Sequence, residues 1–140
     1  MIIIDTNVFS AMMRLKTEPQ IRIWLDRPET MNLRVSAPTI FEIERGISDR
    51  PMGARRRELE SHFANVMTGA FANGILPFDG ESAALAGRVH SKHKAAGRNV
   101  DVPDSQIAGI ALLHRAAIAT RNTRDFSGLG IPLVNPWAAS

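Results

Sequence analysis

The sequence predicts an α/β protein in which helices cover both faces of a central parallel sheet. Short apolar runs rich in β-branched residues alternate with longer segments of helical periodicity. No internal repeat, low-complexity tract or linker interrupts this alternation, and 140 residues are the length of one domain. Parallel strands need crossover connections, which are usually helices. We therefore expect a single domain, residues 1–140, with a parallel sheet between two layers of helices.

The first strand is predicted at residues 1–4, a continuous apolar run of the kind that is buried on both faces. It ends at Asp5, and Thr6 and Asn7 follow, which are residue types that favour the start of a helix. Ligands of open α/β sheets bind in the crevice beyond the carboxyl ends of the strands. Asp5 is therefore either a helix cap or a functional carboxylate, and its position alone favours the cap.

The next segments continue the alternation of helix and strand. Val8 and Met12 lie at helical spacing, and a second short helix begins near Pro19. A strand with alternating apolar residues up to Ala37 is followed by a helix that contains Glu42. Glu42 thus follows a strand closely, as Asp5 does.

The second half of the chain repeats the pattern and contains the other candidate functional residues. We expect a long helix at about residues 53–72, an edge strand or a plain connection at 75–78, and helices at 79–97 and 101–114. A strand at 116–120, an irregular segment at 121–126 and a last strand at 131–134 follow. Asp104 lies in the first turn of a predicted helix, and Asn122 and Asp125 follow a predicted strand. These positions can converge with Asp5 and Glu42 on one crevice.

The composition narrows the class of protein. Seventeen Lys and Arg against fourteen Asp and Glu give a net charge of +3. Fourteen of the seventeen are Arg, whose planar fork matches phosphate, although +3 is ordinary for a soluble domain. The absence of cysteine excludes disulfides and thiolate zinc sites. With no signal peptide and no apolar run of the roughly 18 residues that a membrane span needs, we expect a cytoplasmic protein without a membrane partner.

Carboxylates that follow strands point to metal chemistry. Two like charges about 4 Å apart repel by about 4 kcal/mol at an effective dielectric constant of about 20, and a hard divalent cation removes that repulsion. Mg²⁺ and Mn²⁺ take oxygen ligands and support phosphodiester hydrolysis. The sequence has no P-loop and no G-x-S-x-G motif. His90 and His93 have no third ligand at a zinc spacing, so we expect both to be exposed helix residues.

Four segments in order across nearly the whole chain carry a family resemblance. They read IIIDTN at residues 2–7, TIFEIERG at 39–46, DVPDSQIAGIA at 101–111, and ATRNTRDF at 119–126 followed by NPW. These motifs resemble the PIN-domain ribonucleases, and most of all the VapC toxins of bacterial toxin–antitoxin pairs, including the FitB-like branch. The resemblance implies a PIN-like α/β/α fold and an endoribonuclease that depends on Mg²⁺ or Mn²⁺.

The resemblance also assigns roles to the acidic residues. Asp5 and Asp104 are implied as the main metal ligands, with Glu42 completing the cluster, which reverses the preference for Asp5 as a mere cap. Glu42 matches the acid of the family's E-x-x-x-G pattern, and Asp104 is separated from the following I-A pair by two residues. The fourth position stays open between Asn122 and Asp125, because a spacing of three in a helical turn lets both face one way.

The remaining implications concern support and partners. Thr6 is a candidate to orient Asp5 or a water held by the metal. The implied partners are an RNA substrate and a cognate VapB- or FitA-like antitoxin that covers the acidic pocket, with operator DNA bound only through the antitoxin. A homodimer that assembles with the antitoxin into a hetero-oligomer is also implied. Its interface is expected either at the apolar stripe of Leu59, Phe63 and Met67 or in the segment that carries Val8 and Met12.

A function of a different class is also compatible with the resemblance. The protein is then a subunit of a FitAB-like DNA-binding regulatory complex and has little nuclease activity. The net positive charge and the many Arg residues fit both functions.

Overall fold

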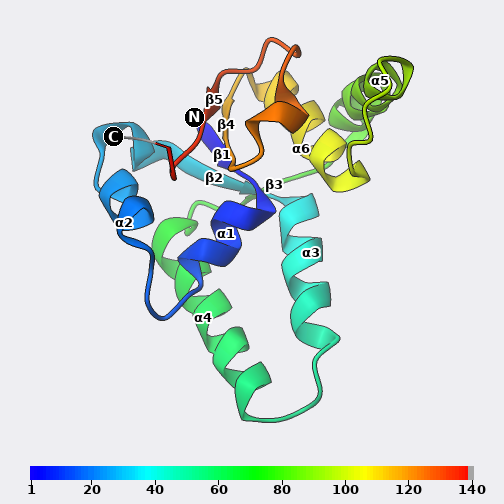
Figure 1. The fold of residues 1–140 in the computed structure, drawn as a ribbon. Coiled ribbons are helices and arrows are strands. Elements are labelled where there is room, and N and C mark those ends of the chain that lie inside the picture. Colours follow the sequence, from blue (N-terminus) through cyan, green and yellow to red (C-terminus); the bar gives the residue numbers. More distant parts are fainter. Residues whose placement is uncertain (139–140) are drawn as a thin grey trace.

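Five parallel strands form one sheet in the order β3-β2-β1-β4-β5 in the computed structural model, which describes residues 1–138 (Figure 1). The strands are β1 (Ile2–Ile4), β2 (Leu33–Ser36), β3 (Ile75–Leu76), β4 (Ala117–Ala119) and β5 (Leu133–Val134). Every pairing between neighbours is parallel. The predicted fold class is therefore confirmed, and the carboxyl ends of the strands meet at one edge of the sheet.

Helices cover both faces of this sheet (Figure 1). They are α1 (Thr6–Met12), α2 (Pro19–Leu25), α3 (Ala37–Ser48), α4 (Ala54–Ala70), α5 (Gly80–Ala95) and α6 (Val102–His114), with 3₁₀ segments η1 (Pro28–Asn32) and η2 (Thr123–Phe126). Helices α1 to α4 pack on one face, and α5 and α6 pack on the other. Within residues 1–138, no helix has both the length and the apolar character needed to cross a membrane.

The first strand supplies side chains to two separate cores. Ile2 and Ile4 pack in the cluster that contains residues of α1 to α4, whereas Ile3 packs in the cluster with α5 and α6. This division follows from the alternation of side chains along a strand. Because both faces of β1 are covered, the run is apolar throughout, as the sequence predicted.

Helices α5 and α6 approach each other closely at a glycine. A Cβ placed on Gly109 of α6 would lie 2.7 Å from the Cβ of Ala86 and would also collide with the carbonyl oxygen of Ser82. The absence of a side chain at Gly109 therefore permits the packing that fixes α6, and with it Asp104, on the sheet.

The predicted end of the second strand was wrong by one residue. Ala37 begins α3 instead of ending β2, because Pro38 occupies the first turn of that helix, where its missing N–H costs no hydrogen bond. The segment before Pro77, expected as an edge strand or a plain connection, is an edge strand, since β3 pairs with β2 alone.

The two apolar surfaces expected at a homodimer interface contact the protein's own core. Leu59, Phe63 and Met67 of α4 pack against it but remain partly exposed, and the rings of Phe9 and Phe63 lie 5.6 Å apart between centroids. Val8 is fully buried and offers no surface to a partner. The homodimer interface at the apolar stripe of α4 therefore stays a prediction.

Candidate functional site

Asp5 stands at the carboxyl end of β1, between the two neighbouring strands β2 and β4. Its side chain is 3% exposed, and both of its carboxylate oxygens accept hydrogen bonds. The backbone N–H of Val8 donates to Oδ1 at 2.9 Å, and the hydroxyl of Thr120 donates to Oδ2 at 2.6 Å. Burial raises the pKa of Asp5, and these two hydrogen bonds partly oppose the rise. Asp5 is thus a helix cap and also a buried, oriented carboxylate.

Thr120 is a residue of this site that the sequence analysis missed. It directly follows β4 and is fully buried, and its hydroxyl also accepts a hydrogen bond of 2.9 Å from the backbone N–H of Asn122. One hydroxyl therefore connects the Asp5 carboxylate to the start of η2. Thr6, predicted as the supporting residue, has its hydroxyl 3.4 Å from that of Thr39 instead.

Asp104 and Asp125 lie near Asp5 and alter its electrostatic surroundings. Asp104 is in the first turn of α6, and Asp125 is in η2. Burial, followed by the negative charges of Asp5, Asp125 and Asp101 and a hydrogen bond to Asp125, raises the pKa of Asp104 to about 7. Three carboxyl groups from distant parts of the chain therefore interact with one another at the edge of the sheet where the strands end.

The structure distinguishes Asn122 from Asp125 by their positions. Asp125 interacts directly with Asp104. Asn122 is exposed, and its backbone makes its contacts, since its carbonyl accepts a hydrogen bond of 3.0 Å from the N–H of Asp125. Asp125 is therefore the residue of this pair whose side chain lies with the other carboxylates.

Glu42 stands at the border of the crevice, on the first turns of α3. Its carboxylate pairs with Arg45 one turn later, with 3.0 Å between Oε2 and Nη2. Arg45 also pairs with Asp49 at 3.3 Å. Glu42 is thus held in an ion pair on its own helix and does not share the hydrogen bonds of Asp5.

The donor set suits a hard divalent cation. In residues 1–138, no three side chains of the His, Asp and Glu types are gathered closely enough to form a complete cage for a metal ion. Mg²⁺ is usually held by only one or two carboxylates, with waters and substrate phosphate as the other ligands. The carboxylate of Asp5, which is held in place by hydrogen bonds, and the carboxyl group of Asp104 fit that kind of site. Their negative charges repel each other, and a cation between them would relieve this repulsion.

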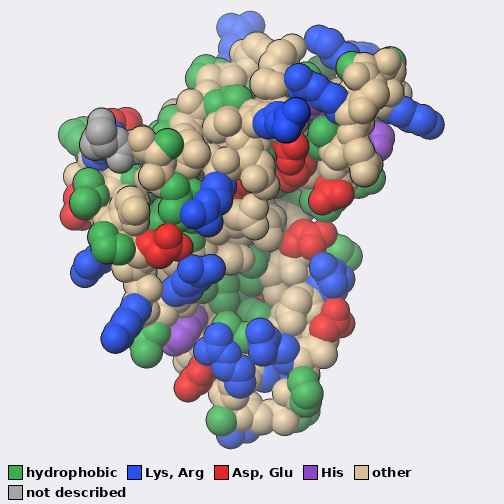
Figure 2. Space-filling model, viewed as in Figure 1, with side chains coloured by type: hydrophobic (Ala, Val, Ile, Leu, Met, Phe, Trp, Pro, Cys, Tyr) green, Lys and Arg blue, Asp and Glu red, His purple; other side chains and the backbone are tan. Residues whose placement is uncertain are grey.

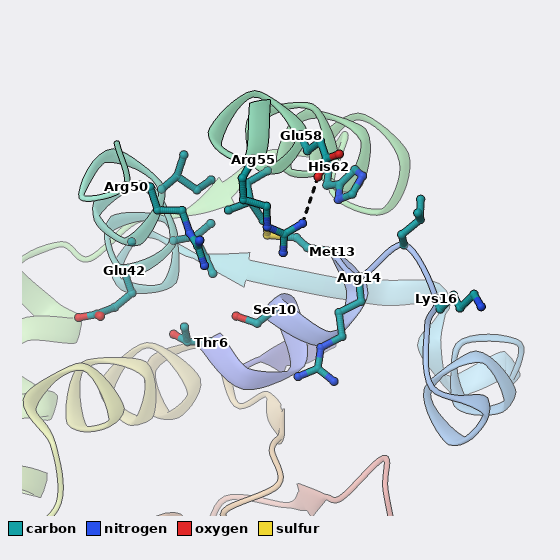
Figure 3. Close-up of a pocket in the computed structure, with 15 residues that line it drawn as sticks. Thr6, Ser10, Met13, Arg14, Lys16, Glu42, Arg50, Arg55, Glu58 and His62 are labelled. Atoms are coloured by element: carbon teal, nitrogen blue, oxygen red, sulfur yellow. Dashed lines mark hydrogen bonds and ion pairs between the residues drawn. The ribbon is translucent and has the colours of Figure 1, made fainter. Parts of the chain in front are cut away.

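A groove of about 750 Å³ opens beside Glu42 and Thr6 and runs between α1, α3 and α4 (Figure 3). Apolar side chains, among them Met13, Ile43 and Leu59, line it together with basic side chains. The basic ones are Arg14, Lys16, Arg50 and Arg55, and Arg55 pairs with Glu58 at 3.2 Å. Glu42 therefore makes the end of the groove near Thr6 acidic, and basic side chains lie along the rest of the groove together with Glu58.

On the face shown in Figure 2, acidic side chains lie in the middle, and Lys and Arg side chains gather above and below them. This arrangement places positive charge on both sides of the crevice. A polyanion that crosses the carboxylates would meet cations on either side of them.

Residues 2–131 match the family model of the PIN domain. This chain belongs to the PIN-domain family. The motifs in the sequence indicated the same family.

Individual PIN-domain relatives match over almost their whole length. The chain is 34% identical to the plasmid stability protein StbB of Pseudomonas syringae pv. tomato, covering 99% of this chain and 100% of StbB. It is 30% identical to the VapC ribonuclease Y4jK of Sinorhizobium fredii, with 98% of each chain covered. Among solved structures, FitAB bound to the IR36 DNA fragment contains a chain that is 31% identical, with a TM-score of 0.86 over 100% of this chain and 98% of that one.

Two histidines of the PIN domain differ from the prediction that both are exposed. The prediction was wrong for His93, which is 4% exposed, and its Nε2 has no hydrogen-bond partner in the described part of the chain. Burial lowers the pKa of His93, and the nearby charge of Arg98 lowers it further. His90 is half-buried, and its Nδ1 lies 2.9 Å from the hydroxyl of Ser105, the neighbour of Asp104. The contact between His90 and Ser105 therefore joins α5 to the first turns of α6, next to Asp104.

Proposed function

We propose that this PIN-domain protein is a toxin that cleaves RNA and is held inactive by a cognate antitoxin. The observation that supports this most strongly is the crevice in which Asp104 faces the charges of Asp5 and Asp125. The similarity to a VapC ribonuclease over 98% of the chain supports the same activity.

In the proposed reaction the carboxylates position a hydrolytic cation and a water. Asp5, fixed by Thr120 and the N–H of Val8, and Asp104 are the proposed Mg²⁺ or Mn²⁺ ligands. When bound, such an ion supplies Lewis acidity toward phosphate oxygens and makes water a better nucleophile. The negative charges of Glu42 and Asp125 are proposed to add to the attraction of the site for the cation.

The proton on Asp104 has a consequence for this chemistry. Its pKa of about 7 means that a fraction of the carboxyl groups is protonated at neutral pH before a cation arrives. Binding of the cation must displace that proton, so the affinity for the cation rises with pH in this range. We propose that Asp125 accepts a hydrogen bond from protonated Asp104 and so holds the proton on Asp104 until the cation binds.

The groove beside Glu42 is the proposed binding site of the antitoxin. Its apolar floor suits hydrophobic side chains of a peptide, and its acidic end suits an Arg or Lys that competes with the cation. Antitoxin bound there blocks both the carboxylates and the path of the RNA. The proposed toxin forms a homodimer that assembles with the antitoxin into a hetero-oligomer, and it acts in the cytoplasm, where RNA is available.

The decisive experiment is cleavage of a mixed RNA pool by purified protein in Mg²⁺, Mn²⁺ or EDTA. The Asp104→Asn variant and a single-stranded DNA of matched sequence serve as controls. Discrete RNA fragments that require both the cation and Asp104 support the proposal. Cleavage by Asp104→Asn at the wild-type rate, or cleavage of the DNA alone, would contradict it.

A second function deserves a test because FitAB, whose structure is similar over the whole chain, was solved bound to a DNA fragment. In that case the protein is a subunit of a DNA-binding regulatory complex with little nuclease activity, and it contacts operator DNA only through its partner. Operator binding by the complex is then unchanged when Asp5, Glu42 and Asp104 are all replaced by amides. Operator binding that requires the partner and survives this triple replacement, together with no detectable RNA cleavage by the wild type, would favour this second function.

A further inference from the structure

A second cleft lies on the opposite side of Glu42 from the groove. It has a volume of about 460 Å³ and is bounded by the start of α3, the start of α6 and the segment that follows β3. Figure 2 shows the surface hollowed between α3 and α6, with acidic and hydrophobic side chains at its edges. Its walls are mainly apolar and include Phe41, Phe78 and Pro103.

Two of these apolar side chains are unusually exposed. Phe41 is 64% exposed and Val102 is 54% exposed, whereas the core aromatics Phe9 and Phe126 are at most 1% exposed. Phe41 precedes Glu42 in the chain, and Val102 comes two residues before Asp104. The cleft therefore borders Glu42 directly, and its other wall is the helix turn that carries Asp104.

We propose that this cleft holds one unpaired nucleobase of the RNA, next to the phosphodiester that is cleaved. The inference rests on the proposed nuclease function and extends it to a specificity subsite. The exposed ring of Phe41 is the stacking surface, and the amide of Gln106, which also lines the cleft, can donate to and accept from the edge of a base.

The charges favour a base over a phosphate at this position. None of the described residues that line the cleft is Lys or Arg, and Glu42 contributes a negative charge. The groove on the other side of Glu42 has four basic residues. Backbone phosphates are therefore attracted to the basic surfaces, while a neutral aromatic ring can enter the cleft without a charge penalty.

The position of the cleft also suits a base that flanks the cleaved phosphodiester. A phosphodiester over the carboxylates carries a sugar and a base on each side, so one base must lie on a surface that borders Glu42 or Asp104. The cleft is such a surface, and it is concave, which suits a planar group that inserts. A base in a duplex has no free face, so the subsite selects single-stranded segments.

Binding of oligonucleotides tests the subsite without any cleavage. The inactive Asp104→Asn protein is titrated in Mg²⁺ with a fluorescent single-stranded RNA and with the same oligonucleotide made abasic at one nucleotide at a time. We expect one abasic position to weaken binding about 10-fold or more. Adding Phe41→Ala should remove this difference, whereas Phe41→Trp should retain it. Equal affinity for every oligonucleotide would overturn the inference.

Steady-state cleavage by the otherwise wild-type protein gives a second readout. Phe41→Ala should raise KM about 10-fold with little change in kcat, and Gln106→Ala should reduce discrimination among bases. Met31→Ala is the control, since Met31 is 90% exposed in η1 and does not line the cleft. An unchanged KM in Phe41→Ala overturns the subsite, whereas a wild-type protein that cleaves no RNA overturns the proposed function instead.

Light scattering distinguishes the subsite from a contact between subunits. The proposal expects the same oligomeric state for the wild type and for Phe41→Ala. If the wild type is a dimer that Phe41→Ala dissociates, the cleft is a subunit interface and the inference is wrong.

Discussion

The hydroxyl of Thr120 donates a hydrogen bond of 2.6 Å to the carboxylate of Asp5, across a separation of 115 residues. Both residues stand at the carboxyl ends of neighbouring strands, β4 and β1. Burial of Asp5 destabilises its charged form and raises its pKa. This hydrogen bond and the one from the N–H of Val8 stabilise the carboxylate and lower that pKa again in part. Thr120 is therefore a positioning residue for the proposed metal ligand.

Replacement of Thr120 by Val should impair cation binding and also reduce stability. The change leaves a buried carboxylate oxygen without its donor, which costs about 1–3 kcal/mol in the free energy of unfolding. Loss of the bond also raises the pKa of Asp5 further, so half-maximal binding of Mn²⁺ moves to higher pH. Calorimetric titration with Mn²⁺ at several pH values and urea unfolding measure the two effects.

Two variants serve as controls for that experiment. Thr120→Ser keeps the hydroxyl and should retain most of the affinity. Thr68→Val removes a hydroxyl from the exposed side of α4, where it bonds only to the backbone of its own helix, and should change little. Binding of Mn²⁺ by Thr120→Val with the wild-type pH dependence would contradict a role for Thr120.

Asp104 should make the metal-free protein less stable as the pH rises toward 8. Its folded-state pKa of about 7 lies above the ordinary value of 3.8, so the folded protein binds the extra proton between these values. The stabilising contribution is complete below about pH 4 and is lost as the pH rises through 7. After allowance for solvent screening, we expect a loss of about 1–2 kcal/mol between pH 5 and pH 8.

The Asp104→Asn variant isolates this effect. It lacks the titrating group, so in EDTA its free energy of unfolding relative to the wild type should increase from pH 5 to pH 8. In saturating Mn²⁺ the wild type should instead have the larger free energy of unfolding, because the cation stabilises only a protein that binds it. A constant difference between the two proteins across this pH range in EDTA would contradict the raised pKa.

The sequence predicted those parts of the fold and site that depend on local pattern. The apolar run before Asp5, the helix start just before Asp104 and the alternation of elements all follow from side-chain periodicity and capping preferences. These signals allowed Asp5 and Asp104 to lie at one edge of the sheet, but only the resemblance to the PIN-domain motifs assigned both to one site.

The missed features depend on contacts between distant segments. Thr120 is one threonine after a short strand, and nothing near it in the sequence shows that Asp5 lies within hydrogen-bond distance. His93 differs, because it lies at helical spacing on the buried stripe of α5 with Ala86 and Val89. Periodicity could therefore have placed His93 on the inner side of the helix, and only its polar character suggested exposure.

The ion pair between Arg45 and Glu42 should oppose cation binding. Arg45 places a positive charge 3.0 Å from the Glu42 carboxylate, and a cation in the crevice must compete with it. If Glu42 takes part in the site, Arg45→Ala should strengthen Mn²⁺ binding by about 2- to 5-fold. Arg56→Ala, which breaks a similar pair with Glu60 on α4, is the matched control. Equal Mn²⁺ affinities in the two variants would argue against participation of Glu42.

Gly109 should be the glycine whose replacement most damages the scaffold of the site. A methyl group there would lie 2.7 Å from the Cβ of Ala86, so α6 must move away from α5 and carry Asp104 with it. We expect Gly109→Ala to lower the free energy of unfolding by about 1–3 kcal/mol or more, since overpacking of a tight contact strains both helices.

Gly87→Ala provides the opposite control on the neighbouring helix. Gly87 lies within α5 with nothing within 4 Å of an added Cβ, so alanine should stabilise the protein by up to about 1 kcal/mol through its higher helix propensity. Urea unfolding of the two variants compares the same chemical change at a packed and at an open position. Because movement of α6 displaces Asp104 from Asp5, Gly109→Ala should also weaken Mn²⁺ binding, while Gly87→Ala should leave it unchanged. Equal stabilities for the two variants would show that α5 and α6 can separate without cost.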